Sequence, residues 1–258
     1  MSDRIEVTAG GTRVVHLDEI ESTNSEAMRR AMRGEAGPLW VVADRQTGGR
    51  GRSGRAWVSP AGNLHASRLM ALGCAPAVVP QLSLVAGIAV FESVRAVAAG
   101  GPDGLRLKWP NDVLVGGDKL SGILVESTTI GQQAIAVIGI GLNLTSHPEG
   151  LDYPATCLGR HHSTTDRRAV LDALDRAIDL WLNAWQEGRG SACIRSAWLE
   201  RAGPIGEPVS VDTGGALLAG TFAGIDDDGA LLLLDSDGSV SRHAYGGVTL
   251  RAGPPSSG

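Results

Sequence analysis

A segment rich in glycine and arginine, residues 46–57 with the sequence QTGGRGRSGRAW, offers the clearest chemistry in this chain. Arg50, Arg52 and Arg55 alternate with glycines, and the segment contains no acidic residue. Arginine presents a planar, permanently charged group that fits carboxylate and phosphate oxygens, and glycine lets the backbone approach a ligand closely. We therefore expect a loop that becomes ordered over a bound anion, either a nucleotide phosphate or an activated acid. Taken alone, the segment is also compatible with an arginine-rich surface turn.

The lysines are a second chemical signal. Of the 23 basic residues only two are lysines, Lys108 and Lys119, and the rest are arginines. A chain with this bias uses arginine wherever a positive charge is enough, so a retained lysine indicates a place that favours a compact ammonium group over a wide guanidinium. Chance placement is the alternative, but both lysines lie in motif-like segments, LRLKWPND and KLSGILVE.

Several familiar kinds of site lack support in the sequence. The loop contains a literal G-x-G-x-x-G at Gly49, Gly51 and Gly54, but residues 59–80 contain no Asp or Glu to bind a ribose, and RAWVSPAGN is a poor start for a helix. There is no Gly-Lys dipeptide for a Walker A loop, no G-x-S-x-G elbow and no H-E-x-x-H cluster. P-loop phosphoryl transfer, serine hydrolysis and zinc chemistry are therefore disfavoured.

Composition limits the location and the partners. The chain has 258 residues and a formal net charge of −5, which gives no general basic field for nucleic acid. We expect no membrane span, because no apolar run appears long enough, and no signal peptide in residues 1–20. The cysteines, Cys74, Cys157 and Cys193, are odd in number and widely spaced, which indicates a reducing cytoplasm rather than a disulfide framework.

Strands and helices alternate along most of the chain and must position these residues. Periodicity predicts strands at residues 13–20, 39–44, 62–71, 105–108, 112–115, 119–127 and 132–144, and helices between Thr23 and Gly34 and at 80–97, 166–188 and 192–201. Thr23 and Glu26 form a capping box, which places Ser22, Thr23 and Asn24 at a helix start with free N–H groups. Plain capping is the alternative to a binding role there.

The later part of the chain contributes packing elements and a second domain. Thr165 is expected to cap the helix at 166–188, and His161 and His162 are expected to be solvated loop residues. After Gly203-Pro204, short strands separated by Gly and Asp turns predict a small β-barrel of about 50 residues. We therefore divide the chain into residues 1–203, a catalytic domain, 204–253, the barrel, and 254–258, a disordered tail.

One strand carries an unusual glycine pattern. Gly139 and Gly141 are two residues apart in the apolar strand 132–144, with Asn143 next in the series. Glycines at this spacing clear one face of a strand, so either a packed helix or a flat ligand must approach that face.

Together these residues describe a site rich in cations and amide donors and poor in nucleophiles. Such a site suits a reaction in which the substrates attack one another and the protein stabilises phosphate charge. Acid activation by adenylation is a reaction of this kind. A carboxylate attacks the α-phosphate of ATP, pyrophosphate leaves, and an amine then attacks the acyl-adenylate.

Four motifs in sequence order also carry a family resemblance. QTGGRGRSGRAW, KWPND at 108–112, KLSGILVE at 119–126 and GIGLN at 139–143, preceded by ESTN, together resemble the biotin protein ligases, also called biotin–acetyl-CoA-carboxylase ligases. The resemblance covers roughly residues 15–250, including LSLVAG in the helix at 80–97. It implies an α+β fold: a class II synthetase-like mixed sheet with helices, followed by a small SH3-like β-barrel. It also implies that biotin and ATP give biotinyl-adenylate, and that a lysine of the biotin carboxyl carrier domain then accepts the biotin.

The resemblance implies a role for each matching residue. Those expected at biotin are Ser22, Thr23, Asn24, Gln46, Arg50, Gly51, Arg52, Lys119 and Gly122. Those expected at ATP or the adenylate are Arg50, Arg52, Arg55, Trp57, Lys108, Asn111 and Asn143. The catalytic set is Lys108, Lys119, Arg52 and Asp112, with Asp112 a candidate for receiving the proton of the incoming amine. Mg²⁺ would enter with ATP, near Asp112, without a protein metal cluster.

Departures from the family are few, and two alternatives remain. Gly48 stands where many relatives have alanine, and Arg68 stands where they usually have an apolar residue, so an inward Arg68 would disturb the biotin pocket. The chain leaves no room for a winged helix-turn-helix, so we expect no binding to operator DNA; a homodimer is compatible with the resemblance. Lipoate ligases share the fold and the acyl-adenylate logic, and an inactive biotin- or nucleotide-binding regulator is the alternative from another class.

Overall fold

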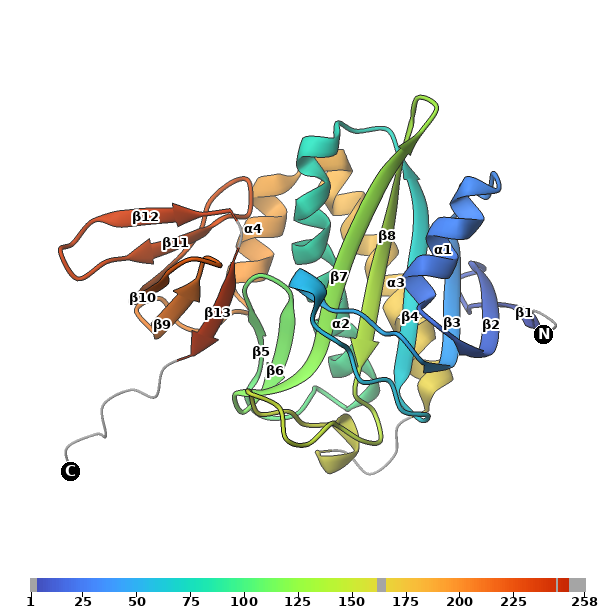
Figure 1. Ribbon diagram of the computed structural model, residues 1–258, viewed down its shortest axis with the longest axis horizontal. Helices are drawn as coiled ribbons and strands as arrows, with labels where there is room; N and C mark the ends of the chain where they lie inside the picture. The colour runs from blue at the N-terminus through green and yellow to red at the C-terminus, as the bar shows by residue number, and fades with distance from the viewer. Residues whose placement is uncertain (1–3, 162–165, 245, 251–258) are drawn as a thin grey trace.

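One eight-stranded mixed sheet forms the centre of the molecule in a computed structural model that describes residues 4–161, 166–244 and 246–250 (Figure 1). Only β2 and β3 pair in parallel; the other neighbours are antiparallel. In spatial order the strands are β1 (Arg4–Val7), β2 (Arg13–Ile20), β3 (Leu39–Gln46), β4 (Leu64–Leu72), β8 (Gln133–Leu142), β7 (Asp118–Ile130), β6 (Asp112–Val115) and β5 (Leu105–Lys108).

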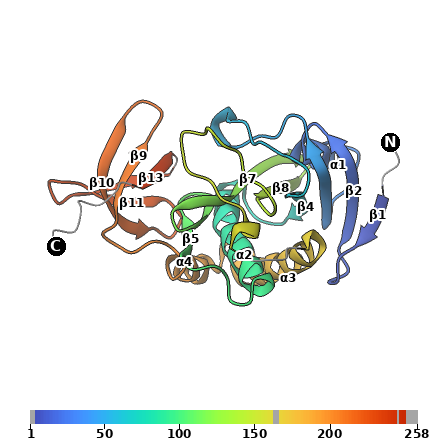
Figure 2. The same ribbon diagram turned by 90° about the horizontal axis from the view of Figure 1, so that it is seen from below.

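Helices cover both faces of this sheet (Figure 2). Helix α1 (Thr23–Met32) packs on one face through Ala27 and Ala31, in a small core shared with Val15 and Val41. Helices α2 (Leu82–Val97), α3 (Arg167–Trp185) and α4 (Ser191–Leu199) lie on the other face, over the larger core. Because successive strand residues point to opposite faces, Val14 and Val15 contribute to different cores. Short 3₁₀ turns are η1 (Arg52–Gly54), η2 (Pro76–Gln81), η3 (Leu158–Arg160) and η4 (Gln186–Gly188).

The apolar stretch Pro76–Val97 corrects one expectation. It is helical over 22 residues and apolar enough to cross a membrane by length and composition alone, although no such run was expected. In the structure 67% of its apolar window is buried, against α3, α4 and the large sheet. Burial of this kind is typical of a core helix.

The C-terminal part forms a second, antiparallel sheet of five strands. Its order is β12 (Val240–His243), β11 (Leu231–Leu234), β10 (Leu217–Ile225), β9 (Pro208–Asp212) and β13 (Gly247–Leu250), so β12 and β13 lie at its two edges. It packs on α4, where the rings of Trp198 and Phe222 meet edge to face at 6.3 Å, and Arg106 on β5 pairs with Glu207 at 2.7 Å. The boundary at residues 203 and 204 stays a prediction, and the expected tail lies outside the described residues.

The capping residues of α1 and α3 differ from the sequence-based expectations. Ser22, not Thr23, is the N-cap of α1, with its hydroxyl accepting from the Ser25 backbone N–H at 3.4 Å. Asp166 caps α3 through the Arg168 backbone N–H, while Thr165 and His162 lie outside the described residues. In both helices the capping residue has an extended backbone and a side-chain oxygen that accepts from a backbone N–H of the first turn.

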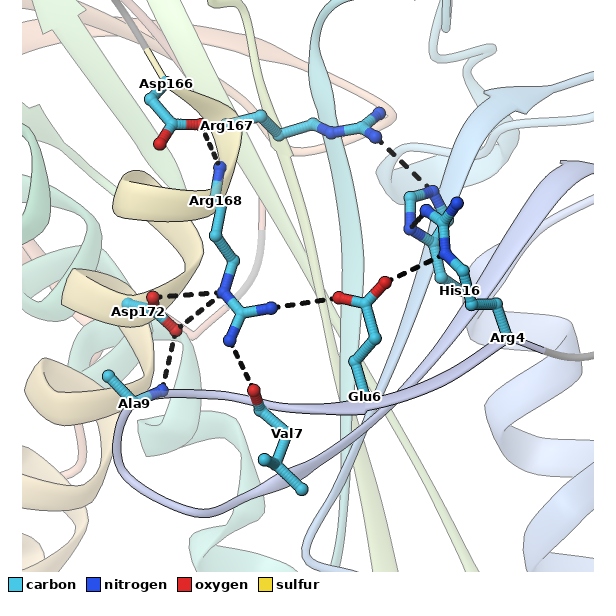
Figure 3. A network of polar contacts seen from close by, with 9 residues as sticks. All are labelled: Arg4, Glu6, Val7, Ala9, His16, Asp166, Arg167, Arg168 and Asp172. Atoms are coloured by element: carbon cyan, nitrogen blue, oxygen red, sulfur yellow. Dashed lines mark hydrogen bonds and ion pairs between the residues drawn. The ribbon is translucent and has the colours of Figure 1, made fainter.

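The N-terminal strand β1 was not expected, because RIEV is short and half-exposed. A polar network fastens it to α3 (Figure 3). Arg168 contacts Glu6 at 2.9 Å and also donates to the Val7 carbonyl, and Asp172 accepts from Arg168 and from the Ala9 backbone. Except for Arg168–Asp172, which lie four residues apart in α3, these contacts join residues more than 160 positions apart in the sequence, so no local pattern predicts them.

Arg68 lies on β4 and points away from the α1 face of the sheet. Its side chain is 3% exposed, pairs with Asp175 and Asp179 on α3, donates to Thr12 and lies over the Trp40 ring at 5.4 Å. Arg68 therefore neither enters a pocket on the α1 side nor reaches solvent, and the disturbance that its position could cause does not arise.

Candidate active site

A cavity of about 320 Å³ opens at the start of β7 and the end of β8. The glycine- and arginine-rich segment 46–57, called the arginine loop from here on, forms part of its wall. The structure brings most of the predicted site residues to its wall. These are Ser22, Thr23, Asn24, Gln46, Arg50, Gly51, Arg52, Arg55, Trp57, Lys108, Asn111, Asp112, Lys119 and Gly122. They come from the start of α1, the end of β3 with the loop after it, and the three consecutive strands β5 to β7 with the turn between β5 and β6, which meet at this cavity.

The start of α1 forms one end of the cavity through a chain of hydrogen bonds. The Thr23 backbone N–H and hydroxyl both donate to Gln46 Oε1, at 2.8 and 3.1 Å, and Gln46 Nε2 donates to Ser59 at 2.9 Å. Ser67 Oγ donates to Thr23 Oγ1 at 2.8 Å or to Asn24 Oδ1 at 2.6 Å, since a hydroxyl has one proton. This end therefore presents fixed amide and hydroxyl groups, as a polar, uncharged head group requires. Ser59 and Ser67 were not singled out from the sequence.

Lys108, Asp112 and Lys119 form the charged centre of the cavity. Lys108 Nζ lies 2.9 Å from Asp112 Oδ2, and Lys119 Nζ lies 2.7 Å from Asp112 Oδ1. Strand pairing explains why both lysines reach Asp112. Asp112 lies opposite Lys108 across β5–β6, and Lys119 lies near the start of β7, the next strand after β6. Two ammonium groups on one carboxylate leave an excess of positive charge, which suits binding of phosphate and carboxylate groups.

Electrostatics keep this centre charged. Burial raises the pKa of Asp112, but the two lysines outweigh it through charge and hydrogen bonding, so the pKa lies below the usual value. Burial lowers the pKa of Arg52, and Asp112 partly offsets that effect. A guanidinium nonetheless stays charged near neutral pH. Both groups are therefore ionised, and the cavity has a fixed electrostatic field in which to receive an anion.

Trp57 occupies the face that the glycines clear. A Cβ atom at Gly141 would overlap the Trp57 ring, one at Gly122 would lie 2.9 Å from it, and one at Gly139 would overlap the Asn24 amide. The expected helix or flat ligand is thus, in this structure, an indole ring and an amide from the chain itself. The Trp57 and Tyr153 rings lie 5.5 and 5.2 Å from Lys119 Nζ, within cation–π distance.

The C-terminal sheet completes the wall, which sequence reasoning missed. Arg52 Nη1 donates to the Gly246 carbonyl at 3.1 Å and Lys108 Nζ to the Val248 carbonyl at 3.0 Å. Residues 212–214 in the β9–β10 turn also line the cavity. These partners are backbone atoms up to 194 residues away, so side-chain patterns could not reveal them.

Two predicted residues are placed differently. Asn143 is buried beside, not in, the main cavity: its Nδ2 donates to the Thr156 carbonyl at 3.0 Å and it lines a small neighbouring void. Its expected contact with adenine or ribose stays a prediction. Asn111 lines the cavity, but its Nδ2 donates to the Ile123 carbonyl at 2.7 Å, so it also braces the hairpin.

No group of three or more His, Cys, Asp or Glu side chains in the described part of the chain could hold a metal ion. Asp112, the acidic residue expected near Mg²⁺, has both oxygens in ion pairs with lysines. Among the described residues, Asp112 is therefore engaged by lysines and not set up as a ligand for Mg²⁺.

Comparison with known proteins matches this architecture. Residues 18–143 match the biotin/lipoate A/B protein ligase family, and residues 205–248 match the biotin protein ligase C-terminal domain. The chain is 42% identical over 225 residues to a biotin–[acetyl-CoA-carboxylase] ligase of Paracoccus denitrificans, covering 84% of this chain and 92% of that protein.

Solved structures agree. A biotin protein ligase from Aquifex aeolicus in complex with biotin and ATP superposes with a TM-score of 0.75 at 28% identity, covering 93% of this chain and 99% of that one. One from Leishmania major in complex with biotinyl-5-AMP gives a TM-score of 0.61 at 25% identity, covering 90% and 98%.

Proposed function

The chain belongs to the biotin protein ligase family, and from that premise we propose how its cavity carries out the two half-reactions. It is an ATP-dependent biotin–[biotin carboxyl-carrier protein] ligase. It converts biotin and ATP to biotinyl-5′-AMP and pyrophosphate, and then transfers biotin to a lysine of a carboxylase carrier protein. The observation that carries our assignment of roles is the pair of lysines held on one carboxylate.

In the first half-reaction we assign binding of the biotin head group to the α1 end of the cavity. Thr23, Asn24 and Gln46 offer donors and acceptors in fixed positions there. The biotin carboxylate then reaches the charged centre, where it attacks the α-phosphorus of ATP. An O–P bond forms, the bond to the β-phosphate oxygen breaks, and pyrophosphate carries away the electron pair.

Positive charge is what this step needs, because an anionic carboxylate must approach an anionic triphosphate. We assign neutralisation of that charge to Lys119, Lys108 and Arg52, with Arg50 and Arg55 on the loop above. Their Coulombic effect is greatest when the loop excludes water, since the local dielectric constant then falls. Trp57, with its ring on the glycine-cleared face, is suited to line the place of the adenylate base.

In the second half-reaction the neutral amine of the carrier lysine attacks the acyl carbon. A C–N bond forms, the C–O bond to the phosphate breaks, AMP leaves with the electron pair, and the amine nitrogen gives its extra proton to water. Asp112 is a weak base for the amine proton, because its pKa is depressed and both oxygens are paired. We therefore assign Asp112 to holding the two lysines and not to proton transfer.

Mg²⁺, the partners and the location belong to the same proposal. Mg²⁺ would enter with the ATP phosphates, since Asp112 could bind it only by giving up a lysine. The free cysteines and the net charge of −5 support a reducing cytoplasm and no nucleic-acid partner. The acceptor is a biotin carboxyl carrier protein or domain, and a homodimer stays a prediction.

The decisive experiment is biotin-dependent release of pyrophosphate from ATP, for the wild type and for Lys119→Arg. The variant keeps the charge but replaces a compact ammonium with a wide plane. We expect turnover with biotin and not with lipoate, and a loss of about 100-fold in the variant, because misplacement by about 1 Å can cost that much. Arg45→Lys, on an exposed pair with Glu19, is the matched control. Silence with biotin would refute the assignment and favour a binding regulator, and full activity of Lys119→Arg would remove the role given to lysine shape.

A further inference from the structure

One carboxylate, that of Glu126 on β7, joins the α1 end of the cavity to the arginine loop. Asn24 Nδ2 donates to Glu126 Oε2 at 2.7 Å, and Arg50 Nη2 donates to Oε1 at 3.1 Å and to Oε2 at 3.3 Å. Glu126 is not among the described residues that line the cavity, so it acts from behind the wall. We propose that Glu126 is a positioning residue that couples the state of the head-group end to the position of the loop. The proposal rests on the function proposed above.

The Asn24 side of the bridge has no spare donor. Its Oδ1 accepts from Ser67 at 2.6 Å, and its Nδ2 donates to the Leu124 carbonyl at 3.2 Å as well as to Glu126. A side-chain amide has two N–H groups, and both are used. The Leu124 carbonyl is fixed in the β7–β8 pairing, whereas the Glu126 side chain can rotate. A ligand that takes an N–H from Asn24 therefore displaces Glu126 first.

The ion pair between Arg50 and Glu126 is weak enough to break when a ligand binds. The Arg50 and Glu126 side chains are 45% and 35% exposed, and a pair so open to water is weak. A phosphate or carboxylate in the cavity can therefore take Arg50 from Glu126. The root of the loop is held independently, because Gly48 N donates to the Glu21 carbonyl at 2.8 Å and Trp57 N to the Gly49 carbonyl at 2.9 Å. Glu126 thus holds the Arg50 side of the loop tip, next to the Arg52–Gly246 contact, and not the attachment of the loop.

The bridge gives the loop two states with different partners. In the ligand-free state Glu126 holds Arg50 against β7 and holds the Asn24 amide in one orientation. When a head group engages Asn24, the displaced Glu126 side chain rotates away, its contacts with Arg50 break, and Arg50 is free to move to the anion. Biotin binding at one end then prepares the loop at the other end for the phosphates.

Hydrogen exchange across residues 46–57 tests this coupling in the intact chain. Glu126→Gln keeps the shape and a carbonyl oxygen for Asn24 but removes the charge that holds Arg50. In the ligand-free protein we expect exchange in these peptides to increase about two- to fivefold, the range for losing a partly exposed ion pair. Glu19→Gln is the matched control, since it removes the same charge from an exposed pair with Arg45 at 3.4 Å. In the wild type and the control, biotin should slow exchange only as far as its carboxylate takes Arg50 from Glu126, whereas in Glu126→Gln, where Arg50 is already free, biotin should slow exchange more.

A double-mutant cycle shows whether Glu126 acts through Arg50. On an Arg50→Gln background, Glu126→Gln should give no further increase in loop exchange, because the partner is already gone. Unchanged exchange in Glu126→Gln, an equal increase in Glu19→Gln, or full additivity with Arg50→Gln would each overturn the proposal. The ligand-free measurement needs no turnover, so it decides the bridge even if pyrophosphate release fails and the proposed function with it.

Discussion

Replacing Arg68 with methionine should destabilise the protein strongly without changing how its cavity works. Arg68 is 3% exposed and its partner Asp175 is fully buried, so the substitution removes the cation from a carboxylate that water cannot reach. Trp40 Nε1 still donates to Asp175 at 2.7 Å, and Thr8 donates from the turn after β1, but neither supplies a positive charge.

The magnitude follows from the two arms of the guanidinium. Breaking a buried pair by removing one partner costs about 3–5 kcal/mol, whereas the arm to Asp179, whose side chain is 48% exposed, adds at most about 1 kcal/mol. We therefore expect the free energy of unfolding to fall by about 3–5 kcal/mol, a large part of the roughly 5–15 kcal/mol of a typical domain. Methionine retains volume, so a cavity term adds little.

Urea unfolding at pH 7 measures this loss of stability. Repeating the measurement at lower pH shows whether the loss depends on the charge of Asp175. Burial raises the pKa of Asp175, but hydrogen bonds from Thr8 and Trp40 and the charge of Arg68 lower it below its usual value. A depressed folded-state pKa contributes stability that is present above the unfolded value of about 3.9 and is lost as pH falls through the folded value. The gap between wild type and Arg68→Met should therefore narrow below about pH 4.

The matching variant is Asp175→Asn on the Arg68→Met background. With no charge left to bury, the double variant should lose less stability than the sum of the two single variants. A loss below about 1 kcal/mol in Arg68→Met would refute the buried-pair argument. A raised KM for biotin in folded Arg68→Met would refute the statement that Arg68 faces away from the pocket.

Two further predictions concern the cavity itself. Gly141→Ala should reduce biotin-dependent pyrophosphate release by at least about tenfold while circular dichroism stays unchanged, because the new methyl group overlaps the Trp57 ring; Gly215→Ala, with open space around it, is the control, and equal activity of both variants would contradict the packing argument. Thr23→Val should raise the KM for biotin about 2- to 10-fold with little change in kcat, because it removes the hydroxyl that donates to Gln46 and accepts from Ser67, while Gln46 keeps the Thr23 backbone N–H and Ser67 can still donate to Asn24. A fall in kcat at unchanged KM would instead show that Thr23 acts in the chemical step.

Alternation and glycine signals predicted most of the strands, because most strands have at least one face on a core, but they missed β1, which is mostly exposed. These signals could not show which face of a strand packs against α1 and which packs against α3. Ser67 and Arg68 are neighbours on β4, and pairing alone decides that Ser67 faces α1 while Arg68 faces α3. GIGLN likewise continues the pattern of β8, but the strand ends at Leu142 and Asn143 is buried beside the cavity, so its contact with the nucleotide stays a prediction.

Contacts between distant segments were beyond sequence reasoning for a different physical reason. The carbonyls of Gly246 and Val248 hold Arg52 and Lys108, and any residue type supplies a carbonyl. Glu126 was visible only as part of KLSGILVE, and its bridge needs α1, the loop and β7 to meet in space. Sequence patterns therefore identify residues with special chemistry, but not the backbone atoms and ordinary residues that orient them.

The two lysines show how far composition alone can lead. Both reach the same carboxylate, and an ammonium group has three donors. Lys108 uses donors on Asp112 and on the Val248 carbonyl, and Lys119 uses one on Asp112, so in the described structure each keeps at least one donor for a ligand. An arginine in either place would tend to form a bidentate pair with Asp112. Its directional N–H donors would then be used by the protein and not by a ligand. A chain that otherwise prefers arginine thus has a physical reason to keep lysine where oxygens of a passing substrate must be held and then released.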